Sequence, residues 1–264
     1  MKRSLTRVNA IFLQEMFITK RSLEVIMDII IFPGMNMVLF GFITVFLQGQ
    51  INAKIAQYIV MGAMLWEVFR ISQYTISVSA LWNIWSRNLS NMYVAPLSYE
   101  ELLSAYAISA LVKGVVLFII FIIIANVFFN FNILTIGIMN IIVGFINLVF
   151  FGISVGLMLL AFLFRYGTGI QAITWGIIYL IQPLTASFFP VSVLPKAIQN
   201  IAYIFPITYV FEAARAALVD PTFKGNYMLT AFILNVIYFF LFFYFFKRFV
   251  NLAKRTGQFS RNEG

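Results

Sequence analysis

The sequence predicts an all-α integral membrane protein with six transmembrane helices, and three observations lead to this fold class. The chain of 264 residues is 62% apolar, and only 10% of it is charged. The stretch from Gly114 to Phe164 contains no charged residue at all. Since a bilayer core of about 30 Å is crossed by roughly 20 apolar residues, this stretch alone is long enough for two spans. Basic residues gather before the first apolar segment and after the last one, as membrane orientation requires.

An amphipathic helix is predicted before the first span. Apolar residues recur there at helical spacing, at Leu5, Val8, Phe12 and Met16. This pattern is typical of a helix that lies in the membrane interface, here with Arg7 and Gln14 on its opposite side. A disordered leader is the alternative.

The six spans are placed by the apolar runs and by the residues that interrupt them. They are expected at about residues 25–47, 57–82, 106–127, 136–164, 168–189 and 227–246. A polar cluster separates the third span from the fourth: Asn126, Asn130 and Asn132. The sequence contains no internal repeat and no stretch polar enough for a soluble domain. We therefore expect residues 1–264 to form a single transmembrane domain.

The basic residues predict a cell-membrane protein with both termini in the cytoplasm. The inner side would then hold twelve of them: Lys2, Arg3, Arg7, Lys20, Arg21, Arg87, Arg165, Lys247, Arg248, Lys254, Arg255 and Arg261. The outer side would hold four: Lys54, Lys196, Arg215 and Lys224. This asymmetry follows the positive-inside rule. It explains the net charge of +9 by contact with anionic lipids, without nucleic acid as a partner.

The residue inventory leaves little room for an enzyme. Cysteine and histidine do not occur, which excludes disulfides, thiolate nucleophiles and imidazole metal sites. Glu100 and Glu101 are adjacent, so on a helix they point about 100° apart and cannot form an acid/base pair. Glu24 and Asp28 lie at the mouth of the first span, where water is close. A membrane-embedded lipid transferase is therefore the least favoured hypothesis, and we assign no catalytic or metal-binding residue.

Glu67 and Arg70 are the most informative polar residues, because both fall inside the second span. An isolated charge near the bilayer centre costs about 2.5–3.5 kcal/mol, and a spacing of three residues lets the two side chains pair. Two hypotheses stay open: the pair lines a substrate path, or it is a structural ion pair that locks two helices. Other residues that could line this path are Gln73, Tyr74, Gln171, Thr174 and Gln182. For the last three, which lie on the fifth span, hydrogen bonding to neighbouring helices is the favoured alternative.

Two further features concern the packing of the third and fourth spans. Lys113 lies about two turns inside the third span, and we expect its side chain to snorkel to the cytoplasmic interface; a contact with substrate is the alternative. Gly152 and Gly156 form a small-xxx-small pair, which indicates close packing of the fourth span against another helix.

The segment between spans two and three, WSRNLSNMYVAPLSYEELLSAY (residues 85–106), predicts a short helix, a turn and another helix. Pro96 would end the first helix. Ser98 and Glu101 have the spacing of a capping box at the start of the next helix. A short rigid helix on the cytoplasmic face is a surface that another protein can push.

The segment between spans five and six, FFPVSVLPKAIQNIAYIFPITYVFEAAR (residues 188–215), is apolar but broken by prolines. We expect Pro195 to begin a helix that runs to about Phe205, Pro206 to stop it, and residues 207–218 to form a second helix. Their apolar faces would be stranded in water unless both helices dip back into the membrane against protein. The sequence therefore predicts two short re-entrant helices on the outer side.

Taken together, the chain resembles the type-2 ABC export permeases, a family that includes membrane subunits of polysaccharide and drug exporters. The resemblance covers the amphipathic helix, the six spans and both interrupted segments. RNLSNMYVAPLSYEELL is similar to the coupling helix of this family, which implies ATPase contacts at Arg87, Asn88, Leu89, Met92, Pro96 and Leu97. The outer segment is similar to the pair of extracellular helices, with the Pro-x-Thr-Tyr pattern at Pro206, Thr208 and Tyr209. Its Glu212 and Arg215 are spaced to pair.

The resemblance implies a homodimer of permeases with two copies of a separate ABC ATPase, which would hold ATP and Mg²⁺. The chain itself has no G-x-x-x-x-G-K-[ST] phosphate-binding motif, so no cofactor is expected on it. The implied activity is outward movement of a lipophilic or lipid-linked glycan, lipid or drug. An ion-coupled secondary transporter or a membrane component of an uptake system is the alternative, with Glu67 as the candidate ion-coupled carboxylate.

Overall fold

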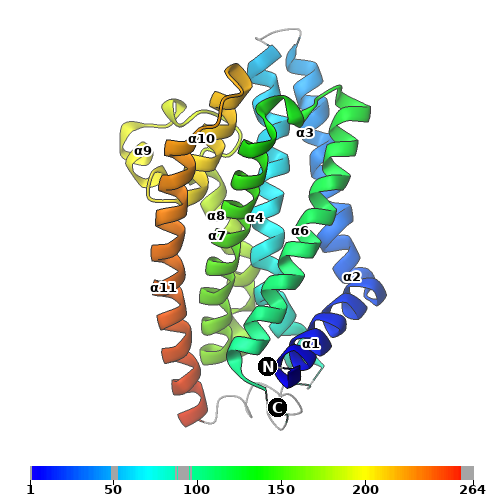
Figure 1. Ribbon diagram of the computed structural model, residues 1–264, viewed down its shortest axis with the longest axis vertical. Coiled ribbons are helices and arrows are strands. Elements are labelled where there is room, and N and C mark those ends of the chain that lie inside the picture. Colours follow the sequence, from blue (N-terminus) through cyan, green and yellow to red (C-terminus); the bar gives the residue numbers. More distant parts are fainter. Residues whose placement is uncertain (1, 49–52, 87, 89–94, 96, 257–264) are drawn as a thin grey trace.

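A computed structural model describes residues 2–48, 53–86, 88, 95 and 97–256, and the regular structure in these ranges is entirely helical (Figure 1). Within these ranges, four helical segments are long and apolar enough to cross a membrane: Leu23–Leu47, Tyr99–Phe129, Ile138–Leu184 and Gly225–Arg255. A bent helix pair raises this number to five if it counts as one span. An all-α membrane protein is therefore confirmed, whereas six spans stay a prediction.

The first described helix leads into the first span. Helix α1 (Lys2–Arg21) is followed by α2 (Leu23–Ile26), the π-helical turn η1 (Met27–Ile31) and α3 (Phe32–Gln48). The side chain of Ser22 caps α2 by accepting a hydrogen bond from the amide of Val25. Leu5 in the predicted apolar stripe of α1 is 65% exposed, whereas Ile11 and Glu15 are buried. The side of α1 that packs on the bundle is thus the partly polar one, which the sequence pattern did not predict.

Helices α4 (Ala53–Trp85), α6 (Tyr99–Phe129), α7 (Ile138–Tyr166) and α11 (Gly225–Arg255) form the body of the molecule (Figure 1). α7 packs against both α4 and α11 and carries much of the core. α6 ends at Phe129, and Asn130 adopts a left-handed conformation with φ of 50°. The short helix η2 (Ile133–Ile136), capped by Asn132, then leads into α7. The predicted boundary at this asparagine cluster is confirmed.

The apolar stretch Ile138–Leu184 folds back on itself. Its 47 residues would be about 70 Å long as one straight helix at 1.5 Å per residue, more than twice the bilayer core. Gly156 of α7 and Thr174 of α8 (Gln171–Leu184) both lie beside Gln73 of α4. The direction therefore reverses at η3 (Gly167–Ile170), where Gly167 has a φ of 76° that favours glycine.

At the end of the molecule opposite α1 lie η4 (Val191–Val193), α9 (Lys196–Ala202) and α10 (Pro206–Val219) (Figure 1). α9 and α10 are bent by 102° relative to each other. Two short helices were predicted here, but their boundary was wrong. α9 ends at Ala202, and Pro206 is the first residue of α10, because proline at this position needs no amide donor. The hydroxyl of Thr208 donates to the carbonyl of Ala202 at 2.7 Å and satisfies the end of α9.

The glycine pair of α7 lets it approach α4 closely, as predicted. A Cβ atom added at Gly152 would lie 2.6 Å from the Cβ of Ser72 and 2.7 Å from the carbonyl oxygen of Phe69. At Gly156, it would lie 2.6 Å from the Cβ of Ile76. These distances are too short for any real side chain, so both positions require glycine if the two helices keep this separation.

We expect Gly152→Ala to lower the free energy of unfolding by about 1–3 kcal/mol, because the added methyl group overpacks the α4–α7 contact. Gly176→Ala is the matched control, since a Cβ there would meet nothing within 4 Å and alanine favours the helix. Thermal unfolding in detergent, followed by circular dichroism, measures both. Equal melting temperatures for the two variants would contradict this account of the packing.

Candidate functional site

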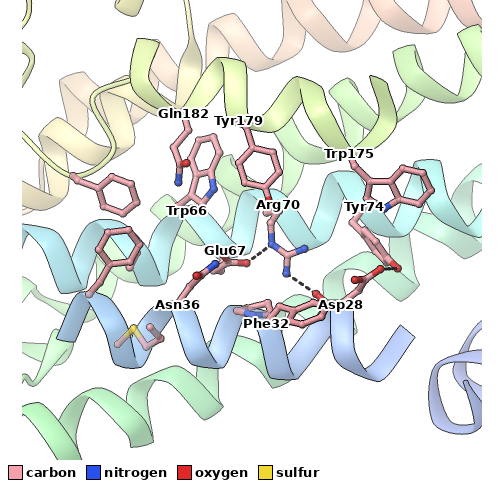
Figure 2. Close-up of a pocket in the computed structure, with 15 residues that line it drawn as sticks. Asp28, Phe32, Asn36, Trp66, Glu67, Arg70, Tyr74, Trp175, Tyr179 and Gln182 are labelled. Atoms are coloured by element: carbon pink, nitrogen blue, oxygen red, sulfur yellow. Dashed lines mark hydrogen bonds and ion pairs between the residues drawn. The ribbon is translucent and has the colours of Figure 1, made fainter. Parts of the chain in front are cut away.

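A cavity of about 280 Å³ lies between the first span, α4 and α8 (Figure 2). Four of the residues predicted from sequence line it: Glu67, Arg70, Tyr74 and Gln182. Aromatic rings make up much of the remaining wall: Phe32, Phe40, Trp66, Trp175, Tyr179 and Phe188. A concave, largely apolar site with a few convergent polar groups is the usual form of a small-molecule site.

Glu67 and Arg70 form the predicted ion pair along one face of α4 (Figure 2). The Nε atom of Arg70 donates to the Glu67 carboxylate, and Nη2 donates to the backbone carbonyl of Asp28 at 3.0 Å. The hydroxyl of Tyr74, one turn further on, donates to the carboxylate of Asp28 at 2.8 Å. The pair therefore joins α4 to the first span and also faces the cavity, so both hypotheses for it are compatible with its position.

The carbonyl of Asp28 is available to Arg70 because the helix is irregular at this point. The amide of Phe32 donates to Met27, five residues back, so it does not bond Asp28 in the α-helical way. The amide that would reach Asp28 in π-helical register is that of residue 33, which is proline and has no hydrogen. Arg70 supplies the missing donor. This arrangement satisfies a carbonyl that would otherwise be costly in an apolar environment.

The other predicted path residues divide between two surroundings. Gln73 is buried and donates to the hydroxyl of Ser77 at 2.7 Å and to the carbonyl of Thr174 at 3.3 Å. Gln73 and Thr174 adjoin a smaller cavity of about 40 Å³, which shares Arg70 and Tyr74 with the larger one. Gln171 is not among the lining residues of either cavity. The structure therefore brings all but Gln171 of the predicted polar residues to one region.

Sequence reasoning missed Asp28 and the aromatic residues of this site. Asp28 was placed near water at the mouth of the first span, but it lines the cavity and contacts Tyr74 and Arg70. The aromatic content gave no signal, because rings that face lipid and rings that face a cavity follow the same helical spacing. The proline five residues after Asp28 was the one available hint of a free carbonyl.

Glu212 and Arg215 of α10 hold a loop over the cavity. Arg215 is only 4% exposed and pairs with Glu212 at 2.9 Å, as predicted. Its guanidinium also donates to the carbonyl of Ala186 at 2.9 Å, and Glu212 accepts from the amide of Val191 at 2.9 Å. Both ends of the 185–191 loop are thereby fixed to α10, and Phe188 within this loop lines the cavity.

Pro195 and Tyr209, which were predicted in the same segment, lie near the beginnings of α9 and α10. Pro195 precedes α9, and its carbonyl accepts from the amides of Ile198 and Gln199. The ring of Tyr209 on α10 lies 5.5 Å from the ring of Tyr203. These contacts join α9 to α10 across their bend, so the outer segment forms one packed unit.

At the opposite end, α1 is fixed to α6 by two ion pairs. Arg7 donates to Glu101 through Nη2 at 2.6 Å and through Nε at 2.9 Å. Glu101 also completes the predicted capping box with Ser98. The prediction for Lys113 was wrong: its side chain does not snorkel, because its ammonium lies 3.4 Å from the carboxylate of Glu15 inside the bundle. α1 brings this carboxylate within reach.

Two of the predicted coupling residues lie within the described ranges, and both adjoin α1. The side-chain Nδ2 of Asn88 donates to the side-chain Oδ1 of Asn83 at 3.0 Å, and the same oxygen accepts from the side chain of Gln14 on α1 at 3.0 Å. Asn88 and Leu97 line a cavity of about 270 Å³ together with Arg7 and other residues of α1. The other predicted coupling residues, Arg87, Leu89, Met92 and Pro96, lie outside the described residues.

We expect Glu67→Gln to lower the free energy of unfolding by about 2–4 kcal/mol, because it leaves the Arg70 charge without its counter-ion. The double variant Glu67→Gln/Arg70→Gln should be closer to wild type than this single variant, since it removes the unpaired charge. Denaturant unfolding in detergent measures both, with the exposed Glu100→Gln as control. A Glu67→Gln variant as stable as wild type would show that the pair is not held by charge.

Comparison with known proteins supports the resemblance seen in the sequence. Residues 6–219 match the family described as ABC-2 type transporter. A search of the curated proteins found no match. The matched region includes most of α1, the residues that line the cavity, the segment 85–106 and the paired helices α9 and α10. The chain therefore belongs to the ABC-2 type transporter family, as a membrane-embedded permease component.

Proposed function

We propose that this chain is the permease subunit of an ATP-driven exporter, which moves a lipophilic or lipid-linked substrate outward across the cell membrane. The observation that carries the proposal is the cavity between the first span, α4 and α8, which combines an ion pair with aromatic walls inside an ABC-2 permease. Charged groups within apolar helices are expensive and commonly mark a substrate path. Under this proposal, the polar residues of α4 and α8 form the wall of that path.

The proposed topology has six crossings with both termini in the cytoplasm. It counts the first span, α4, α6, α7, α8 and α11, with α7 and α8 as separate crossings because the chain reverses between them. The beginning of α1 and the end of α11 lie at the same end of the molecule, and α9 and α10 lie at the other (Figure 1). Basic residues are concentrated at the two termini. This supports a cytoplasmic location for the end of the molecule that holds the beginning of α1 and the end of α11.

The proposed motor contact is the segment between α4 and α6. Members of the family work with an ABC ATPase, and the present chain has no phosphate-binding motif of its own. Two permease copies and two ATPases, which hold ATP and Mg²⁺, would form the complete exporter. Because Asn88 and Leu97 adjoin α1, a force that the ATPase exerts on this segment would be transmitted to α1, α4 and α6 together. At the outer end, the 185–191 loop covers the cavity and would have to move to release the substrate.

Topology can be tested directly, because the chain contains no cysteine. We expect a cysteine at Val193, which is 66% exposed, to react with a membrane-impermeant maleimide in intact cells. A cysteine at the exposed Ala95 should react only after the cells are opened. Labelling of both positions from the same side would overturn the proposed arrangement.

The motor contact is tested by charge reversal. We expect Arg87→Glu to reduce co-purification of the cognate ATPase at least ~10-fold. Reversal of a charge at an interface should weaken binding by about 1.4 kcal/mol or more, and 1.4 kcal/mol corresponds to a 10-fold change in affinity. Arg255→Glu, at the end of α11, is the matched control and should retain the ATPase. If Arg87→Glu combined with Leu89→Asp left both ATPase association and export intact, the assignment of this segment would be wrong.

A further inference from the structure

We propose that the cavity between the first span, α4 and α8 selects an organic cation, such as a substituted ammonium with an attached ring or chain. The inference rests on the proposed function, because it concerns the substrate of the same path. The proposal narrows the substrates that the sequence left open, which were a glycan, a lipid and a drug. Three properties of the cavity carry it: its charge, its aromatic wall and its size.

The cavity carries more negative than positive charge. Among the described residues that line it, the charged ones are Asp28, Glu67 and Arg70. Arg70 is already paired with Glu67 and bound to the Asp28 carbonyl (Figure 2). One carboxylate, that of Asp28, is therefore in excess, and one of its oxygens accepts from Tyr74. A phosphate or sulfonate placed here would meet this carboxylate without a free cation to offset the repulsion, whereas an ammonium would be attracted.

The aromatic wall suits the same ligand. Trp66, Trp175 and Tyr179 surround the ion pair on one side, and Tyr74 lies beside the Asp28 carboxylate (Figure 2). A ring face attracts a cation within about 6 Å of its centre, tryptophan most strongly, and aromatic cages are the usual binding sites for quaternary ammonium groups. Tyr179 is 65% exposed, so its ring is not needed for the packing of this chain. A glutamine and an asparagine, Gln182 and Asn36, complete the polar lining without adding charge.

The size of the cavity limits the ligand. A cavity of about 150 Å³ admits benzene, so one of about 280 Å³ holds a charged head with one ring and not a glycan chain. Longer apolar parts of a substrate would lie outside the cavity, along the apolar surfaces of α3 and α8. The Phe188 ring of the 185–191 loop stacks on Phe40 at 4.6 Å and closes the outer side of this cage.

The test measures direct binding to the purified permease in detergent, with protein-free micelles subtracted. The two probes are phenyltrimethylammonium and benzenesulfonate, which share a ring and carry opposite charge. We expect saturable binding of the cation, at least ~10-fold tighter than that of the anion. Asp28→Asn should weaken cation binding about 5- to 10-fold and still accept the Tyr74 hydrogen bond through its amide oxygen. Tyr179→Leu should weaken it about 3-fold, within the range of one cation–π contact.

Two control variants match these changes away from the cavity. Asp220→Asn removes an exposed carboxylate before α11, and Tyr244→Leu removes a ring that is 57% exposed on α11. Both should bind the cation as wild type does, and circular dichroism checks that all four variants are folded. Cation affinity that falls in both cavity variants, and in neither control, is the result that supports the proposal.

Other outcomes overturn it in distinguishable ways. Benzenesulfonate binding that equals or exceeds that of the cation, and that is lost on Arg70→Gln, would refute the cation and leave the cavity as a substrate site. Absence of saturable binding by both probes would also refute the cation. ATPase co-purification is measured on the same preparations. A permease that binds the cation but never associates with an ATPase would refute the exporter and not the ligand class.

Discussion

The need to neutralise charge inside an apolar bundle governs the arrangement of this protein. Four of the ion pairs among the described residues have at least one buried side chain: Glu67–Arg70, Glu15–Lys113, Arg7–Glu101 and Glu212–Arg215. An unpaired charge in such surroundings would cost several kcal/mol. Each pair therefore fixes the helices that carry it. The first faces the cavity, the next two hold α1 on α6, and the last anchors the outer loop.

The same constraint acts on backbone groups. The π-helical turn in the first span and the proline after it leave the Asp28 carbonyl without a backbone donor. The guanidinium of Arg70 meets this need while it pairs with Glu67. A single side chain thus joins α4 to the first span and sets the charge of the cavity wall. Arg70 therefore contributes both to helix packing and to the charge of the cavity. Its substitution should affect both the stability of the protein and the binding of a ligand in the cavity.

Much of the fold could be predicted from the sequence, because it depends on local properties. Apolar runs, capping residues and prolines predicted most helices, and a spacing of three residues predicted the pairs Glu67–Arg70 and Glu212–Arg215. Contacts between distant segments could not be predicted in this way. Lys113 was expected to snorkel because its partner, Glu15, lies on α1, and the residue pattern did not show that this side of α1 packs on the bundle. Asp28 was missed because Pro33 is the one sign in the sequence of the free Asp28 carbonyl, and a proline alone does not predict a π-helical turn.

The order of the partners along the chain has a consequence for biosynthesis. Glu67 and Arg70 are neighbours on one helix, as are Glu212 and Arg215, so each pair can form as soon as that helix exists. In the pairs that join two helices, Arg7 precedes Glu101 and Glu15 precedes Lys113. The acceptor carbonyls of Asp28 and Ala186 likewise precede Arg70 and Arg215. Arg70 and Lys113, the basic residues inside predicted spans, therefore enter the lipid after their partners have been made, whereas Arg7 and Glu15 of α1 are made before theirs.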